Sequence, residues 1–79
     1  MSKIKLIWDF RGEGALQTAK HHAVHLNEFL EREKVSDSSG DYAQISQMHS
    51  IAFVITDKSN MIVLRDALKP NRGEVYQEE

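Results

Sequence analysis

Cysteine is absent from the 79 residues, and proline occurs only once. Without cysteine the chain forms no disulfide bond and carries no thiol chemistry. A domain of this size buries only a limited core, and small domains commonly gain stability from disulfides, a bound metal or a partner subunit. With disulfides excluded, the sequence leaves a metal or oligomerisation as the remaining sources of extra stability.

An excess of positive charge is also lacking. Ten Lys and Arg residues stand against twelve Asp and Glu residues, which gives a formal net charge of −2. The basic residues are scattered, and the acidic end GEVYQEE would repel phosphate. Because nucleic-acid-binding domains normally present a basic face, we expect no nucleic-acid partner.

No apolar run is long enough to cross a membrane or to form the core of a signal peptide. The apolar stretch near the start, MSKIKLIWDF, is interrupted by Asp9, and Arg11 follows shortly after it. We therefore expect no membrane partner and a cytoplasmic location, with which the lack of cysteine agrees. The length and the absence of internal repeats predict one small α+β domain over residues 1–79.

Two elements at the start of the chain follow from hydrophobic periodicity. Residues 3–10 alternate with period two, which is typical of a strand that buries one face. The buried face is expected to carry Ile4, Leu6, Trp8 and Phe10. Residues 15–34 change to helical spacing, with a buried stripe of Ala15, Leu16, Ala19, Ala23, Leu26 and Leu30. The indole N–H of Trp8 needs an acceptor, for which we expect Asp66 or a backbone carbonyl.

The second half of the chain predicts two further strands. Residues 35–41 have the composition of a loop, and residues 42–56, polar at first and apolar later, predict the second strand. The sequence DKSN, residues 57–60, predicts a hairpin turn into a third strand over residues 61–68, which is rich in branched side chains. Residues 70–79 then predict a flexible acidic tail.

The predicted fold is therefore α+β, with the order β-α-β-β, a three-stranded sheet and one helix packed on one face. This arrangement resembles the first half of a ferredoxin-like split β-α-β unit, which implies that the third strand lies between the first and the second. The other face would expose the apolar residues Ile7, Met48, Ala52, Val54, Met61 and Val63. Such a patch indicates a partner, and a second copy related by a two-fold axis is the simplest one, so we expect a homodimer.

Three of the four histidines lie within five positions of the predicted helix, in the sequence HHAVH. His21 and His25 are four residues apart, so both can point to the same side of the helix and hold zinc or nickel. The metalloprotease motif HExxH is not matched, because no glutamate follows His21. The pair is a weak metal candidate, and we expect no cofactor.

The fourth histidine predicts a cluster that faces the helix. His49 falls among the odd-numbered residues of the second strand, and the hairpin through residues 57–60 would bring it diagonally next to Asp66. A carboxylate at that position would orient the imidazole. The other members of this cluster would be Gln47 and either His22 or His25. We expect His22 and His25 to lie at the edge of the buried stripe, bordering the core, and His21 to face solvent. The cluster would be a structural polar network, a ligand or catalytic site, or a metal site, and a shift of one residue in register would turn His49 away.

Arg11 lies in the sequence FRGEGA, where a glycine loop precedes the helix and where Arg11 would clamp a carboxylate or phosphate. The sequence matches neither the Rossmann fingerprint nor the P-loop. The function expected first is a homodimeric module that binds a small anionic ligand or a protein partner without catalysis. The alternatives are a small enzyme, with His49 as general acid/base held by Asp66, and a histidine-based divalent metal-binding protein.

Overall fold

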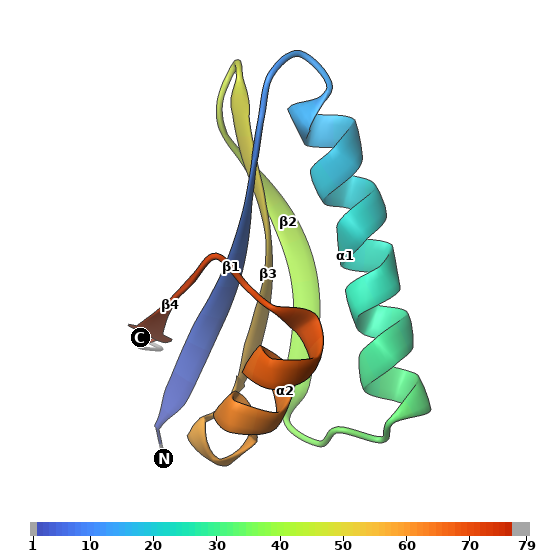
Figure 1. Ribbon diagram of the computed structural model, residues 1–79, viewed down its shortest axis with the longest axis vertical. Coiled ribbons are helices and arrows are strands. Elements are labelled where there is room, and N and C mark those ends of the chain that lie inside the picture. Colours follow the sequence, from blue (N-terminus) through green and yellow to red (C-terminus); the bar gives the residue numbers. More distant parts are fainter. Residues whose placement is uncertain (1, 77–79) are drawn as a thin grey trace.

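The computed structural model describes residues 2–76 (Figure 1). Its elements in chain order are β1 (Lys3–Arg11), α1 (Ala15–Arg32), β2 (Ser38–Ser46), β3 (His49–Asp57), the short 3-10 helix η1 (Lys58–Asn60), α2 (Met61–Leu68) and β4 (Arg72–Tyr76). The strands form one antiparallel sheet in the order β2-β3-β1-β4. The fold is α+β as predicted, but the described residues contain four strands and two α-helices rather than three strands and one helix.

The strand order places one strand between the two ends of each helical connection. β3 lies between β1 and β2, which α1 connects, and β1 lies between β3 and β4, which α2 connects. This is the complete β-α-β-β-α-β order of a ferredoxin-like sheet, of which the periodicity predicts only the first half. The third strand does lie between the first and the second, as predicted. It is formed by His49–Asp57, however, whereas the sequence predicts that residues 61–68 form it.

The segment 42–56, predicted as one strand, is most of a hairpin. β2 ends at Ser46 and β3 begins at His49, with a tight turn between them. The backbone N–H of Gly12 donates to the carbonyl of Met48 at 2.8 Å, which anchors this turn to the end of β1. β2 is a largely exposed edge strand and β3 a largely buried central strand, so the change from polar to apolar residues marks the boundary between them.

Residues 61–68 form helix α2 and not the predicted third strand. Branched side chains favour a strand locally, but the apolar residues also recur with helical spacing. The residues on the core side of the helix are Met61, Leu64 and Leu68. Leu64 is fully buried in the core, whereas Ile62 and Val63 are exposed on the other side of the helix. Packing of one apolar side against the sheet therefore overrides the strand preference.

The sequence DKSN starts a helix rather than a hairpin turn. The carboxylate of Asp57 accepts hydrogen bonds from the hydroxyl of Ser59 at 2.6 Å and from its backbone N–H at 3.0 Å, as an N-cap does. These hydrogen bonds hold the pKa of Asp57 below its ordinary value. At the other end, Lys69 adopts a left-handed conformation with φ of 52°, and Pro70 follows, so α2 stops there.

Residues 72–76, predicted to belong to the acidic tail, form β4 along the edge of β1. The backbone N–H of Asn71 donates to the carbonyl of Ile7 at 2.9 Å and brings this segment back to the sheet. Residues 77–79 of the predicted tail lie outside the described residues. The predicted loop over residues 35–41 is also shorter, because β2 begins within it.

The core lies between the sheet and the two α-helices, with α1 packed chiefly over β2 and β3 (Figure 1). Its buried cluster consists of Ile4, Leu6, Trp8, Ala23, Leu26, Leu30, Ala52, Val54 and Leu64. The indole N–H of Trp8 donates to the backbone carbonyl of Leu68 at 3.0 Å, so one of the two expected acceptors is confirmed and Asp66 is not the partner. Neither helix within residues 2–76 is long and apolar enough to span a membrane.

The even-numbered residues of β3 face the helices, opposite to the prediction. The register of β1 and β3 places Ala52 opposite Trp8 and Val54 opposite Leu6, and directly opposite residues share a face. Ala52 and Val54 are fully buried. The odd-numbered residues, including His49, therefore lie on the face away from the helices, because a shift of one residue exchanges the two faces of a strand.

The apolar residues that β1 and β3 place on that face are Ile7, Ile51, Phe53 and Ile55, and not the set that the sequence predicts. Three members of the predicted set belong to the core side, namely Ala52, Val54 and Met61. Ile7 does lie on the face away from the helices, where it is only 2% exposed. Met48 and Val63 are exposed, but they lie in the β2–β3 turn and on α2.

The helical conformation of residues 61–68 makes a prediction about stability. Replacing Leu64→Ala should lower the free energy of unfolding by about 2–5 kcal/mol, because it leaves a cavity under α2. Ile62→Ala on the same helix should change it by less than about 0.5 kcal/mol, since Ile62 is largely exposed. Urea unfolding followed by circular dichroism measures both. Equal losses in the two variants would contradict the assignment of the buried side of α2.

Candidate functional site

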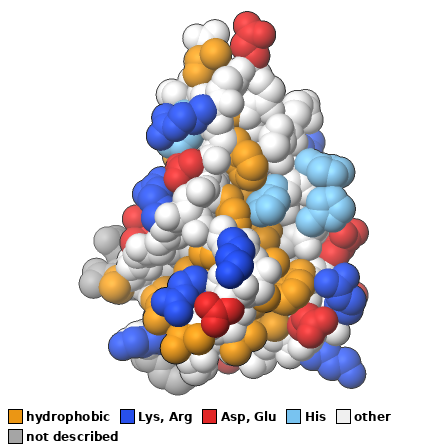
Figure 2. Space-filling model, viewed as in Figure 1, with side chains coloured by type: hydrophobic (Ala, Val, Ile, Leu, Met, Phe, Trp, Pro, Cys, Tyr) orange, Lys and Arg blue, Asp and Glu red, His pale blue; other side chains and the backbone are white. Residues whose placement is uncertain are grey.

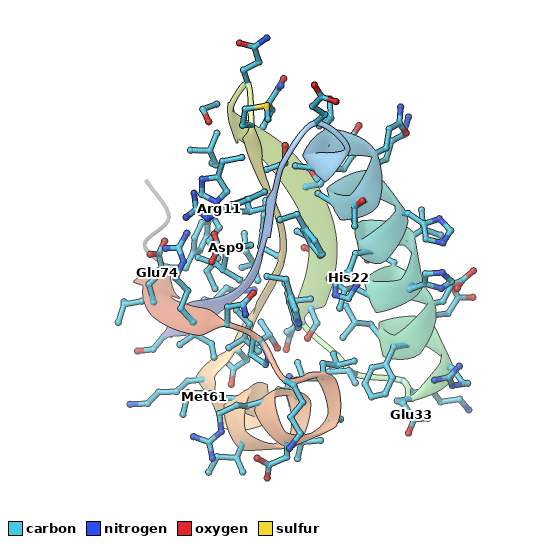
Figure 3. The ribbon with its side chains drawn as sticks, turned by 45° about the horizontal axis from the view of Figure 1, so that its top comes forward. Asp9, Arg11, His22, Glu33, Met61 and Glu74 are labelled. Atoms are coloured by element: carbon cyan, nitrogen blue, oxygen red, sulfur yellow. The ribbon has the colours of Figure 1, made fainter. Side chains whose placement is uncertain are left out.

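The face of the sheet away from α1, here called the open face, is built from alternate residues of all four strands. It carries Lys5, Ile7, Asp9 and Arg11 from β1, Ser39, Asp41 and Ala43 from β2, His49, Ile51, Phe53 and Ile55 from β3, and Arg72 and Glu74 from β4. Figure 3 shows Asp9, Arg11 and Glu74 on this side of the sheet, whereas His22 lies between the sheet and α1. The open face therefore gathers charged groups from segments far apart in the sequence.

A carboxylate at the centre of this face holds three strands together. Asp9 Oδ1 lies 2.8 Å from His49 Nε2 and 3.2 Å from Arg72 Nη2. Asp9 Oδ2 accepts a hydrogen bond from Arg72 Nε at 3.1 Å. The backbone N–H of Asp9 also donates to the side-chain oxygen of Asn71 at 2.7 Å. Asp9 thus connects β1 to β3 through His49 and to β4 through Arg72 and Asn71.

The charges around Asp9 keep it ionised. The hydrogen bond from Arg72 lowers the pKa of Asp9 most. The hydrogen bond from His49 and the charge interactions with Arg72 and His49 lower it further, against the opposing effect of burial. In return, the carboxylate raises the pKa of Arg72. The bidentate contact is the strong form of an arginine–carboxylate pair.

The contact with Asp9 fixes the orientation of His49. When the imidazole is neutral, donation from Nε2–H to Asp9 leaves a lone pair on Nδ1. Within residues 2–76, no hydrogen bond involves Nδ1, and the His49 side chain is 15% exposed. Arg11 is the residue directly opposite His49, and none of the ion pairs formed by residues 2–76 includes its guanidinium. His49 and Arg11 therefore offer two polar groups for a ligand.

The predicted pairing of His49 with Asp66 is wrong. Asp66 lies exposed on α2, where its carboxylate is 3.6 Å from Arg65 Nε. Because residues 61–68 are helical, no β-hairpin brings Asp66 beside His49. Gln47 lies exposed in the β2–β3 turn and not on the helix side of the sheet.

His22 is separated from His49 by the sheet. Its ring packs against the rings of Trp8 and Phe10, at centroid distances of 5.3 and 5.4 Å. Nε2 of His22 is buried and has no hydrogen-bond partner within residues 2–76. Burial lowers the pKa of His22 most, and the nearby His25 and His21 lower it further. His22 is therefore a half-buried histidine at the edge of the core whose neutral form is favoured, which agrees with its predicted position at the edge of the buried stripe.

His21 and His25 lie together on the exposed side of α1, so His25 does not border the core as predicted. Their Nε2 atoms are 3.0 Å apart, and His25 Nδ1 lies 3.1 Å from Glu28 Oε1. Figure 2 shows histidine side chains gathered on the surface over α1. Two convergent imidazoles with a carboxylate behind one of them resemble a partial metal site. Within residues 2–76, no group of three or more potential metal ligands is present.

Arg11 belongs to the open face and not to the start of α1. Gly12 has a φ of 108°, and its carbonyl accepts a hydrogen bond from Ala15 N at 3.2 Å, so the glycine sequence makes a tight turn. The turn carries the chain from β1 to α1, on the other side of the sheet from His49. The sequence predicts that Arg11 binds an anion at the start of the helix. In the structure Arg11 lies opposite His49 on the open face instead.

Sequence reasoning missed Asp9, Arg72 and Asn71. The alternation of β1 does place Asp9 on the same side as Ile7, which identifies it as a residue of the open face. Its partners Arg72 and Asn71 lie within the segment predicted as a tail, and only the pairing of β4 with β1 brings them to Asp9.

A groove lies beside this network, between α2 and β4. Its volume is about 400 Å³, which falls in the range of small-molecule sites. The apolar part of its lining consists of Ile4, Leu6, Met61, Pro70 and Val75. Arg72 and Asn71 also line it, so the segment that holds Asp9 forms one wall of the groove. Neither His49 nor Arg11 contributes to this lining.

Comparison of the chain with protein-family models, with curated proteins and with solved structures finds no match.

The Asp9 network makes a prediction about acid stability. Asp9→Asn should lower the free energy of unfolding at pH 7 by about 1–3 kcal/mol, because two donors lose a charged acceptor. Since the pKa of Asp9 is lowered from 3.8, its contribution is complete above that pH and is lost as the pH falls through the folded-state pKa. The difference between wild type and variant should therefore shrink below about pH 4.

Urea unfolding at a series of pH values measures this difference. Asp66→Asn is the matched control, because Asp66 is an exposed carboxylate whose loss should change the free energy of unfolding by less than about 0.5 kcal/mol. If both variants behaved alike at pH 7, the network would not hold the sheet.

His22 predicts a second pH dependence, at higher pH. Its folded-state pKa is lowered from 6.5, so the folded chain binds a proton less readily than the unfolded chain. The stability associated with neutral His22 is complete above about pH 6.5 and is lost as the pH falls through the folded-state pKa. His22→Leu should remove this loss, whereas His21→Leu on the exposed side should retain it. Unfolding free energies that fell in parallel for wild type and His22→Leu would exclude His22 as the titrating group.

Proposed function

We propose that this protein is a homodimeric binding module that holds a small anionic ligand on its open face, without catalysis. The observation that carries the proposal is the position of Arg11 opposite His49, whose Nε2 atom is held by Asp9 at 2.8 Å. Arg11 has no ion-pair partner among residues 2–76 and supplies N–H donors suited to a carboxylate or a phosphate. The oriented imidazole of His49 adds a donor at Nδ1 when it is protonated.

The surrounding charges favour an anion over a cation. The carboxylate of Asp9 is already neutralised by the bidentate contact with Arg72. Arg11 therefore supplies a positive charge that this network does not compensate. Apart from the orienting carboxylate of Asp9, neither a nucleophile nor a further acid/base group contacts His49 among residues 2–76, which favours binding over catalysis.

Titration with inorganic phosphate, followed by ¹H–¹⁵N NMR, tests the ligand site. Signals of the β1 and β3 ends, at Arg11 and His49, should shift with a single saturable dissociation constant. Arg11→Gln should weaken binding at least about tenfold, the loss expected for one charge-assisted contact of roughly 1.5 kcal/mol. Arg32→Gln is the matched control, since Arg32 is an exposed arginine on α1. Equal weakening by both variants would show general charge attraction and contradict the proposal.

A second candidate function is favoured by one observation, the 2.8 Å contact between Asp9 and His49. In this alternative His49 is a general acid/base, and Asp9 takes the orienting role that the sequence assigned to Asp66. Turnover of a bound anion that His49→Gln abolished, with the phosphate affinity retained, would favour this enzyme over the binding module.

Three expectations from the sequence stay predictions. They are the cytoplasmic location, a protein partner other than a second copy, and the absence of a resident zinc or nickel ion. For the metal, the His21–His25 pair alone supplies two ligands, fewer than the three or four of a physiological zinc site. We therefore expect only weak binding there, dependent on neutral imidazoles.

A further inference from the structure

Exposed apolar side chains occur on both α2 and β4, and Val75 lines the groove between these two elements, whereas Ile62 and Val63 lie outside its lining. Val75 of β4 is 72% exposed, and Ile62 and Val63 of α2 are 58% and 66% exposed. The apolar groove of about 400 Å³ lies between these two elements. Figure 2 shows hydrophobic side chains at the surface in the lower part of the molecule, where Figure 1 places α2. A surface of this kind on a small protein indicates an interface.

The free edge of the sheet lies next to the same surface. β4 is the last strand in the order β2-β3-β1-β4, so among the described residues only β1 pairs with it. The outer edge of β4 therefore presents unpaired backbone groups, which favour the addition of another strand. An apolar groove beside a free strand edge is suited to a partner that supplies both a strand and an apolar side chain.

We propose that the β4 strands of two copies of this chain pair antiparallel across a two-fold axis at Gly73, with each Val75 covering the mouth of the partner's groove. This inference rests on the homodimer of the proposed function and names its interface. An axis of this kind brings the same surface of both copies together, so the strand must be complementary to itself.

The charges of β4 select the register. An axis at Arg72 would place two arginines opposite each other, and an axis at Glu74 would place two glutamates opposite each other. Like charges directly opposite destabilise a strand pair. An axis at Gly73 instead places Arg72 opposite the partner's Glu74 and forms this ion pair twice. Of the three registers, with the axis at Arg72, Gly73 or Glu74, only the one with the axis at Gly73 therefore pairs opposite charges between the two copies.

The contacts of Arg72 leave it able to make this pair. Its Nε and Nη2 atoms bind Asp9, whereas Nη1 lies 3.9 Å from Glu74 of the same chain. Nη1 is therefore the donor for the partner's Glu74. The guanidinium would connect the Asp9 network of one copy to β4 of the other, which couples the interface to the open face.

The same register fills the groove. If the pairing extends one residue beyond the start of β4, Val75 comes opposite the partner's Asn71, which lines the groove. Directly opposite side chains lie about 4.5–5.5 Å apart at Cβ, so Val75 contacts the groove of the partner. Gly73 at the axis places no side chain between the copies on that side.

The interface is small, which sets its expected strength. A five-residue strand and one groove bury less than the roughly 800 Å² per partner of a standard interface. We therefore expect a reversible dimer with a dissociation constant between about 1 μM and 1 mM.

Sedimentation velocity of the full chain over a range of concentrations tests the interface. Val75→Lys puts a charge at the groove mouth, and Glu74→Arg puts an arginine opposite the partner's Arg72. Each should raise the dissociation constant at least about tenfold, equivalent to 1.4 kcal/mol. Val24→Lys is the matched control, because Val24 is an exposed valine on α1. Circular dichroism of each variant checks that it folds. If Glu74→Arg fails to fold, Val75→Lys alone tests the interface.

The possible results separate this inference from the proposed function. Dimerisation of the wild type that both variants weaken and Val24→Lys does not would support the β4 interface. A dimer insensitive to Val75→Lys and Glu74→Arg would overturn this interface and leave the homodimer standing. A wild type that stays monomeric at millimolar concentration would overturn both the interface and the homodimer. The phosphate titration tests the ligand site independently of either result.

Discussion

The register between β1 and β3 is the constraint on which the rest of the molecule depends. It pairs Trp8 with Ala52 and Arg11 with His49. The first pair sends both side chains under the helices and into the core. The second pair places His49 on the open face. Asp9 is opposite Ile51, two residues from His49 on β3, so the two side chains lie diagonally on the same face. A shift of one residue would bury the charged set and expose the apolar one, so core packing and the candidate site are fixed together.

Asp9 extends this constraint to the end of the chain. β4 is short and largely exposed, so burial of apolar surface contributes little to holding it. The bidentate contact with Arg72 and the hydrogen bond with Asn71 attach it to β1 instead. The open-face network, the wall of the groove and the proposed dimer strand therefore share one segment, which is why a change at Arg72 would affect all three.

The histidines of this chain occupy three different environments. His22 packs among aromatic rings at the edge of the core and is favoured in its neutral form, while His21 and His25 contact each other on the solvent side of α1. His49 is the one oriented by a carboxylate in the sheet. His21, His22 and His25 are close in sequence, but His22 lies in a different environment from the other two, because neighbouring residues of a helix point in different directions.

Periodicity alone determined the first strand, the helix α1 and its buried stripe, because these patterns are long and each has one period. It singled out His49, but the predicted partner Asp66 and the predicted face toward the helix were both wrong, because Asp9 contacts His49 on the open face. The tertiary structure decided the conformation of residues 61–68, whose branched residues suit a strand while their spacing also suits a helix. It also decided the face of β3 and the position of β4, because short segments take their conformation and register from the partners against which they pack.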